Sequence, residues 1–135
     1  MLSVSDNAWG GSIKEFIQDL EWKLAQPSNL PPCPSNPSKY WDKCFADHKF
    51  ENGEHYFGEF FDDEFNGIGI GTSTHGTVYI GEFKDGKHHG KGKITSLKDG
   101  ANYIGQWKNN KMDGLGIFTK SSGDKYIGQF VNGRL

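Results

Sequence analysis

Residues 79–83 read Tyr-Ile-Gly-Glu-Phe, and the chain repeats this stretch three more times. The other copies are Tyr-Phe-Gly-Glu-Phe at 56–60, Tyr-Ile-Gly-Gln-Trp at 103–107 and Tyr-Ile-Gly-Gln-Phe at 126–130. The four tyrosines are 23, 24 and 23 residues apart. A nearly constant period of this length is typical of a repeat array, in which each repeat is one small supersecondary unit.

Glycines follow the same period. One glycine stands three residues before each tyrosine, and Gly-x-Gly pairs lie at residues 67/69, 90/92 and 114/116. Ahead of the first tyrosine, the small residues Cys44 and Ala46 take the place of such a pair. Half of a degenerate repeat is therefore predicted to begin near residue 43.

The alternation inside each copy predicts strands. Tyrosine, glycine and the second aromatic residue share one face of a strand. We expect the rings to lie over the glycines of the neighbouring strand, since glycine otherwise weakens strands. Short turns at 84–87, 108–111 and 131–133 contain Asp-Gly, Asn-Asn and Asn-Gly, and the two that end in glycine are strong hairpin signals. We therefore predict a mainly β protein, in which residues 43–135 form one antiparallel meander of β-hairpins.

The pattern of Tyr-x-Gly-x-aromatic, a turn with glycine, Gly-x-Gly and a later glycine resembles the MORN (membrane occupation and recognition nexus) repeat. The resemblance is close over residues 54–133 and looser over 43–53. The turn at 61–66 departs from it, because it lacks the glycine and adds the aromatic residues Phe61 and Phe65. The resemblance implies a single-layer, coiled sheet and a role as scaffold or adaptor, and the family's name implies membrane binding.

The first 42 residues have a different organisation. Residues 1–11 read as a flexible start, 12–26 as an amphipathic helix and 27–42 as a proline-rich linker. Residues 12–15 form a capping box, and an apolar stripe with helical spacing follows. The stripe consists of Ile13, Phe16, Ile17, Leu20 and Leu24. The helix is expected from about residue 13 to 25, ending before Pro27.

A helix of this length is marginal in water by itself, so its stripe must be buried. The stripe packs either on this protein's own sheet or in the groove of a partner. All five prolines lie between residues 27 and 37, which excludes a helix or a central strand there. This segment is interpreted as a spacer, or as a ligand for an SH3- or WW-type domain.

Composition narrows the class of protein. The 135 residues suit one domain, and 14% aromatic residues with 19 glycines argue against disorder. A net charge of −2 gives no argument for nucleic acid binding. Neither a long apolar run nor a signal peptide is visible. Two cysteines, Cys33 and Cys44, are too few for a disulfide framework or a zinc site. We expect a cytoplasmic protein, with peripheral membrane attachment as the alternative.

No catalytic constellation is visible in the sequence. The five histidines have no partner at metal-binding spacing, and the glycine pairs lack the context of a phosphate loop. We therefore expect no enzyme activity, no cofactor and no metal site. The pair His88-His89 is expected to be exposed at a turn, with metal or anion binding as the alternative. Residues 62–64 are expected to form a solvated acidic turn, with binding of a cation or a basic partner as the alternative.

The charges are unevenly distributed along the repeats. Residues 54–76 hold five acidic and no basic residues, whereas residues 77–100 hold five basic and three acidic ones. Basic residues near an anionic membrane contribute about 1 kcal/mol each. The candidates for binding acidic lipid or another anion are Lys84, Lys87, Lys91 and Lys93.

The preferred function is a non-catalytic protein–protein interaction module that uses the repeat sheet and the N-terminal helix. The alternative is a peripheral membrane module that binds acidic phospholipids. The candidate residues for a protein partner are Phe16, Leu20, Trp22 and Leu24. Open strand edges at both ends of the sheet also allow an edge-to-edge homodimer.

Overall fold

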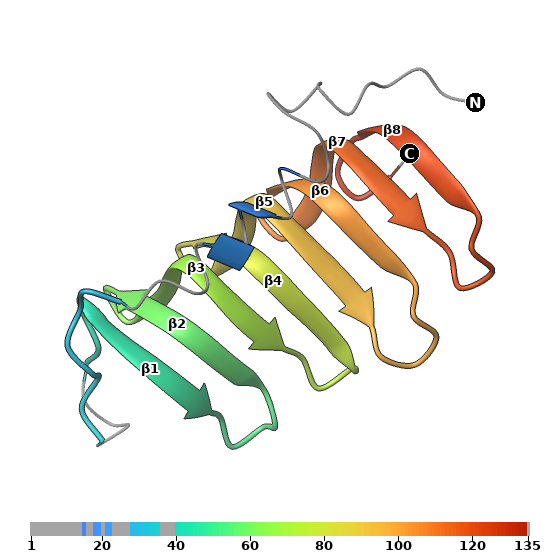
Figure 1. Cartoon of the computed structure of the whole chain (residues 1–135). Coiled ribbons are helices and arrows are strands. Elements are labelled where there is room, and N and C mark those ends of the chain that lie inside the picture. The colour runs from blue at the N-terminus through green and yellow to red at the C-terminus, as the bar shows by residue number, and fades with distance from the viewer. Residues whose placement is uncertain (1–14, 16–17, 20, 23–27, 36–39, 135) are drawn as a thin grey trace.

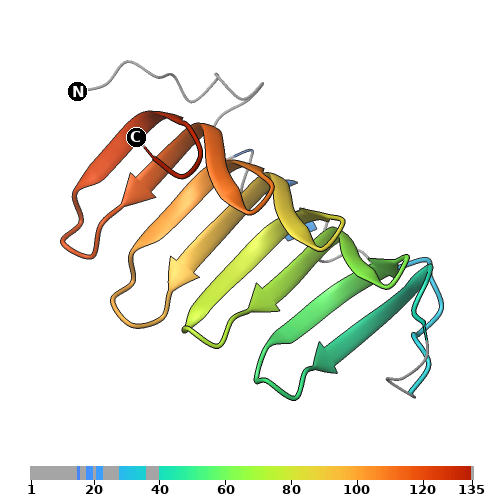
Figure 2. The same ribbon diagram turned by 180° about the vertical axis from the view of Figure 1, so that it is seen from behind.

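The structure is a computed structural model that describes residues 15, 18–19, 21–22, 28–35 and 40–134. Eight strands form one antiparallel sheet, in which each strand pairs with the next in sequence. Figures 1 and 2 show one open layer, with the strands following each other from end to end. The predicted meander is thereby confirmed. The strands are β1 Cys44–Lys49, β2 His55–Phe61, β3 Glu64–Thr72, β4 Thr77–Lys84, β5 Lys87–Ser96, β6 Asn102–Lys108, β7 Lys111–Thr119 and β8 Lys125–Phe130.

The predicted N-terminal helix lies mostly outside the described residues and stays a prediction. Three of its candidate residues, Phe16, Leu20 and Leu24, belong to the part that is not described. Trp22 is described and is 63% exposed. No helix in the described part of the chain is long and apolar enough to span a membrane.

Tight turns close the hairpins as predicted. Asp85 and Gly86 have φ angles of 51° and 80°, and this pair of left-handed residues matches the twist of a two-residue hairpin turn. Asp62 and Asp63 adopt the same conformation, with φ angles of 51° and 63°. Aspartate tolerates this region better than most residues, so the first hairpin closes without the usual glycine.

Each tight turn is also hydrogen bonded to the repeat before it. The turn amide donates, over 2.6–3.0 Å, to a backbone carbonyl in the second residue of β3, β5 or β7, or just before β1 for the first turn. Successive repeats therefore stack with one constant offset. The pairs are Asp63 to Trp41, Gly86 to Phe65, Asn110 to His88 and Gly133 to Met112.

The tyrosines lie over the glycines, as the alternation predicted. The Tyr79 hydroxyl donates to the carbonyl oxygen of Glu82 at 2.8 Å, which bends its ring back across the sheet. A Cβ atom on Gly92 would overlap this ring, and one on Gly116 would overlap the ring of Tyr103. Glycine is therefore required in these strands to make room for the rings, and the predicted faces are confirmed.

The core is a continuous row of rings, here called the aromatic ladder. Each ring meets the next edge to face, with centroids 4.9–5.3 Å apart. Each of the first three repeat tyrosines bridges the second aromatic residue of its own repeat and that of the next, so the ladder links the repeats to one another. The order is Phe60, Tyr56, Phe83, Tyr79, Trp107, Tyr103, Phe130 and Tyr126.

A bulge interrupts the register inside each complete hairpin. Between β4 and β5 the pairing shifts between Gly81 and Phe83, and the Glu82 side chain accepts the Lys91 amide at 2.6 Å. In the next repeat Gln106 accepts the Leu115 amide at 2.8 Å. This role was not predicted from the sequence, although glutamate or glutamine follows each of the four repeat tyrosines by three residues.

The opposite face of the sheet carries a second apolar row. Cross-strand neighbours from β2 to β8 form this row, here called the isoleucine row, and a single lysine interrupts it. Its members range from buried to exposed, with Ile104 at 6% and Phe57 at 37% exposure. The row runs through Phe57, Ile70, Ile80, Lys93, Ile104, Ile117 and Ile127.

The edge of β1 is paired by part of the proline-rich segment. The Cys33 amide donates to the Phe45 carbonyl at 2.7 Å, and the Phe45 amide donates to the Pro31 carbonyl at 2.9 Å. This pairing brings Cys33 beside Cys44, and the two form a disulfide. The two cysteines therefore form one covalent link between this segment and β1. The sequence predicted no disulfide framework, and it did not reveal this single bond because the backbone pairing that brings the two cysteines together has no signal in the sequence.

Candidate interaction surfaces

A pocket of about 340 Å³ opens at the β1 end of the aromatic ladder and is here called the acidic pocket. Its walls are aromatic: the ring centroids of Trp41 and His48 are 4.9 Å apart, and those of His48 and Phe50 are 4.5 Å apart. Its rim is acidic. The lining residues are Trp41, His48, Phe50, Phe60, Asp63, Glu64, Phe65, Asp85 and Gly86.

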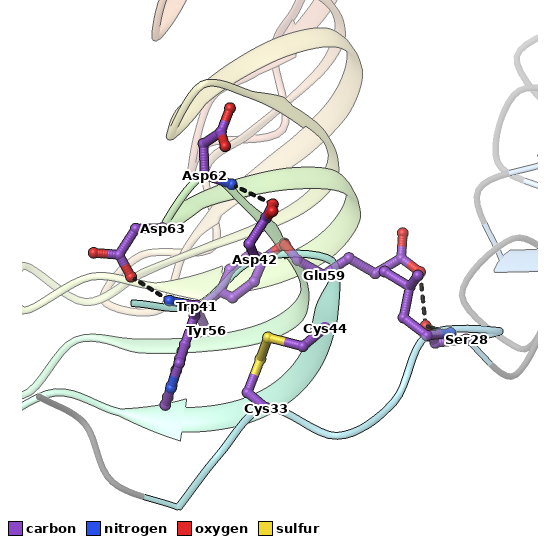
Figure 3. Close-up of a disulfide and its surroundings, with 10 residues drawn as sticks. Ser28, Cys33, Trp41, Asp42, Cys44, Tyr56, Glu59, Asp62 and Asp63 are labelled. Carbon is purple, nitrogen blue, oxygen red and sulfur yellow. Dashed lines mark hydrogen bonds between the residues drawn. A yellow bond between two sulfur atoms is a disulfide. The ribbon is translucent and has the colours of Figure 1, made fainter. Parts of the chain in front are cut away.

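The acidic turn between β2 and β3 is hydrogen bonded to the segment that carries Trp41 (Figure 3). Asp63 accepts the Trp41 amide at 3.0 Å, and Asp42 accepts the Asp62 amide at 2.9 Å. The Tyr40 hydroxyl donates to Asp62 at 2.6 Å, and this hydrogen bond raises the pKa of Tyr40 to about 12. The carboxylates are exposed, as expected for a solvated turn, but they also anchor the segment that carries Trp41.

Trp107 in the aromatic ladder and Trp41 at its end differ in their hydrogen bonding. Trp107 donates its indole Nε1–H to the Gly92 carbonyl at 3.1 Å. Trp41 is 7% exposed, and its Nε1 has no acceptor among the described residues. A buried donor without an acceptor lowers the stability of the fold by about 1–3 kcal/mol, and the Trp41 indole N–H is such a donor.

His88 is not the exposed turn residue that the sequence analysis expected. Its ring lies flat on that of Tyr79, with centroids 3.7 Å apart, and Trp107 meets it edge to face at 5.1 Å. Burial lowers the pKa of His88 to about 4. The sequence signal was present, because the equivalent positions hold Phe65 and Met112, both of which pack against the core.

A second pocket, of about 380 Å³, lies further along the ladder, and its charge differs from that of the first. Trp107 and Met112 form part of its wall, and its charged residues are Lys111 and Asp99. The first pocket has three carboxylates and no lysine or arginine. The two pockets therefore have similar size but different electrostatic character.

The four candidate lysines share the face of the isoleucine row. Lys84 and Lys87 are cross-strand neighbours on either side of the β4–β5 turn, and Lys93 belongs to the row itself. Lys91 is partly buried and pairs in register with Gln106. The structure brings these residues together on β4 and β5, whereas three of the four candidates for a protein partner lie outside the described residues.

Among the described residues, no group of three or more histidine, cysteine, aspartate or glutamate side chains could hold a metal ion. The family model described as MORN repeat matches residues 56–70, 79–96, 103–125 and 126–135. No curated protein matches the chain.

Proposed function

Because the chain belongs to the MORN-repeat family, we propose that it is a non-catalytic protein-interaction module that binds its partner through the repeat sheet. Repeats of this family commonly take part in protein or membrane interactions. The observation that carries the proposal is the isoleucine row. It crosses seven of the eight strands, and no second layer of strands covers it in the described part of the chain.

An apolar row of this length favours an apolar partner surface. Burial of apolar area stabilises a complex by about 25 cal/mol per Å² before the costs of association are subtracted. A helix with an apolar stripe can lie across such a row, because its residues at i, i+3 and i+4 form one continuous face.

The N-terminal segment is one candidate to cover the row. The Ser28 hydroxyl donates to Glu59 at 2.7 Å, and Glu59 lies on the same face of β2 as Phe57. Ser28 therefore lies at the face of the isoleucine row. Residues 12–26 and a partner protein are the two candidates for this surface, and they lead to different binding results.

Affinity capture from native cells tests the proposal, with the full chain compared with a chain that begins at Ser28. This start keeps both the disulfide and the Ser28–Glu59 hydrogen bond. A partner that binds only the full chain identifies the helix as the recognition element. A partner that binds the shorter chain equally well or better identifies the sheet.

Substitution in the row provides the control for that experiment. Ile80→Lys with Ile117→Lys should abolish capture by the sheet, because both side chains belong to the row. Thr74→Lys with Ser121→Lys adds the same charge at exposed positions outside the row and should leave capture intact. Failure of the folded full chain to retain any protein would contradict the proposal.

The lipid alternative is favoured by the shared face of Lys84, Lys87 and Lys93. Its test is co-sedimentation with vesicles, with and without acidic phospholipid, at low and high salt. Binding that needs acidic lipid and weakens with salt supports it. Changing Lys84, Lys87, Lys91 and Lys93 to Gln should then abolish sedimentation. The matched control changes four exposed lysines of the later repeats, which are Lys108, Lys111, Lys120 and Lys125.

The cytoplasmic location is a further proposal, and the disulfide makes it testable. Disulfides persist in oxidising compartments and are rare in the reducing cytosol. Thiol alkylation in intact cells, read as a mass shift, should modify Cys33 and Cys44 if the protein is cytoplasmic. Protection of both thiols until a reductant is added would contradict this location.

A further inference from the structure

The walls of the acidic pocket have the arrangement that recognises an organic cation. Rings of Trp41, Phe50, Phe60 and Phe65 surround it, and neighbouring rings meet edge to face at 4.9–5.8 Å. A cation within about 6 Å of an aromatic centroid is attracted by the ring quadrupole, by roughly 0.5–2 kcal/mol. A volume of about 340 Å³ is sufficient for one long side chain.

The rim supplies the complementary charge. Asp63, Glu64 and Asp85 line the opening, and none of them makes an ion pair with a described lysine, arginine or histidine. The acidic turn of the first repeat thus concentrates negative charge over an aromatic pocket. The similar pocket near Trp107 lacks this feature, because Lys111 lies at its wall.

Trp41 adds a second, independent requirement. Its buried Nε1–H has no acceptor among the described residues, although Trp107 has one in Gly92. A peptide carbonyl is an acceptor that a bound segment would bring along its own backbone. The pocket therefore offers rings and carboxylates for a cationic side chain, and the buried Trp41 Nε1–H gains an acceptor only if the ring moves when a segment binds.

We propose that the acidic pocket binds a lysine or arginine side chain carried by an extended segment of the partner protein. The aromatic rings enclose the side chain, and the carboxylates at the rim neutralise the cation. This inference rests on the proposed protein-interaction function, and it specifies the chemistry of the partner as a basic peptide.

The test is an NMR titration of the ¹⁵N-labelled full chain with capped pentapeptides Gly-Gly-X-Gly-Gly, in which X is lysine, arginine or norleucine. The lysine or arginine peptide should shift the Trp41 indole signal and the amides of residues 63–65 and 85–86. The norleucine peptide has the same length without the charge and should produce at most a small shift.

Variants separate the pocket from the general charge of the chain. Glu64→Gln with Asp85→Asn should weaken binding of the basic peptide by about tenfold, the equivalent of about 1.4 kcal/mol. Glu51→Gln with Glu54→Gln removes the same charge at exposed positions outside the pocket and should change binding little. Trp41→Phe replaces the aromatic ring that attracts cations best by a weaker one, so it should also weaken binding.

Three results would overturn the inference. One is an equal response to the norleucine and lysine peptides, and another is an equal loss in the two charge variants. The third is no response to any peptide. If affinity capture still retains a partner, that third result removes the acidic pocket as its site and leaves the proposed function standing.

Discussion

His88 lies within the ladder as a neutral ring, and its burial makes stability depend on pH. Its pKa is about 4 in the folded chain and about 6.5 in the unfolded chain. The unfolded chain therefore binds the proton more tightly between these values. The free energy of unfolding should be highest above pH 6.5 and fall by roughly 3 kcal/mol as the pH drops from 6.5 to 4.

The variant His88→Phe tests this. Phenylalanine occupies the equivalent place in the preceding repeat, where Phe65 stacks on Tyr56 at 4.1 Å. Urea unfolding at several pH values should give a shallower dependence for the variant between pH 6.5 and 4 than for the parent chain. Identical slopes would show that His88 does not titrate in this range.

Gly92 is a second position where one atom decides stability. A Cβ atom there would overlap the Tyr79 ring, which has neighbours on both sides in the ladder. Gly92→Val should cost about 3 kcal/mol or more by overpacking, seen as a lower thermal melting temperature. Gly71→Ala is the matched control, because its Cβ meets only Phe83 atoms, at 3.3 Å or more. An unchanged melt for Gly92→Val would refute the packing of ring on glycine.

The packing of single residues could be predicted from the sequence where the repeat period and the alternation within a strand agree. Tyrosine and glycine recur with one spacing, so their shared face followed from strand geometry. His88 was misjudged because its own neighbours, Lys87 and His89, look like a solvated turn. The equivalent residues of the other repeats, Phe65 and Met112, are apolar, and this indicates that the position of His88 faces the core.

Among the elements, the bulge between β4 and β5 depends on one carboxylate. Glu82→Ala should cost about 1.5–3 kcal/mol, because it removes the acceptor of the Lys91 amide. Glu82→Gln should cost much less, since Gln106 makes the equivalent bond at 2.8 Å. Chemical denaturation measures both variants. Equal losses would mean that the charge of Glu82, rather than its hydrogen bond, stabilises the bulge.

The disulfide that links the proline-rich segment to β1 should make a measurable contribution to the free energy of unfolding. Cys33 and Cys44 are separated by 11 residues, and closing a loop of this size stabilises the fold by about 3 kcal/mol in the chain-entropy treatment. Reductant should lower the urea midpoint of the parent chain accordingly. The double variant Cys33→Ala with Cys44→Ala should start from the lower midpoint and show no response to reductant. A parent chain that is insensitive to reductant would contradict the contribution.

The hairpins were predictable and the pairing at the edge of β1 was not, for a physical reason. Hairpins form from residues close in sequence, whose turn chemistry is visible in Asp-Gly and Asn-Gly pairs. Pro31 and Cys33 pair with Phe45 through backbone hydrogen bonds, and such bonds have no side-chain pattern that a sequence could reveal. The acidic pocket was not predicted either. Its lining residues are distant in the sequence, from Trp41 to Gly86, and only the folded sheet brings them together.

For the whole molecule, the two edges of the sheet are unequal. Residues 31–33 pair with β1, whereas the outer edge of β8 has no partner strand in the described part of the chain. An unpaired edge is a template for another strand. We expect a two-fold dimer through β8, detected by light scattering as a mass that rises from monomer to dimer with concentration. A monomer mass at every concentration would contradict it.

The hydrogen bonds between each turn and the preceding repeat also bear on how such a chain changes over generations. Because each strand pairs only with its neighbours in sequence and each tight turn is bonded to the preceding repeat, successive interfaces share one backbone pattern, although their side chains differ. A duplication or deletion of one whole repeat in the gene then adds or removes a matching interface and leaves the others intact. A shift of a few codons would instead misalign ring and glycine. The length of the sheet can therefore change by one whole repeat at a time. Such a change alters the distance between the acidic pocket and the β8 edge and leaves the residues of both unchanged.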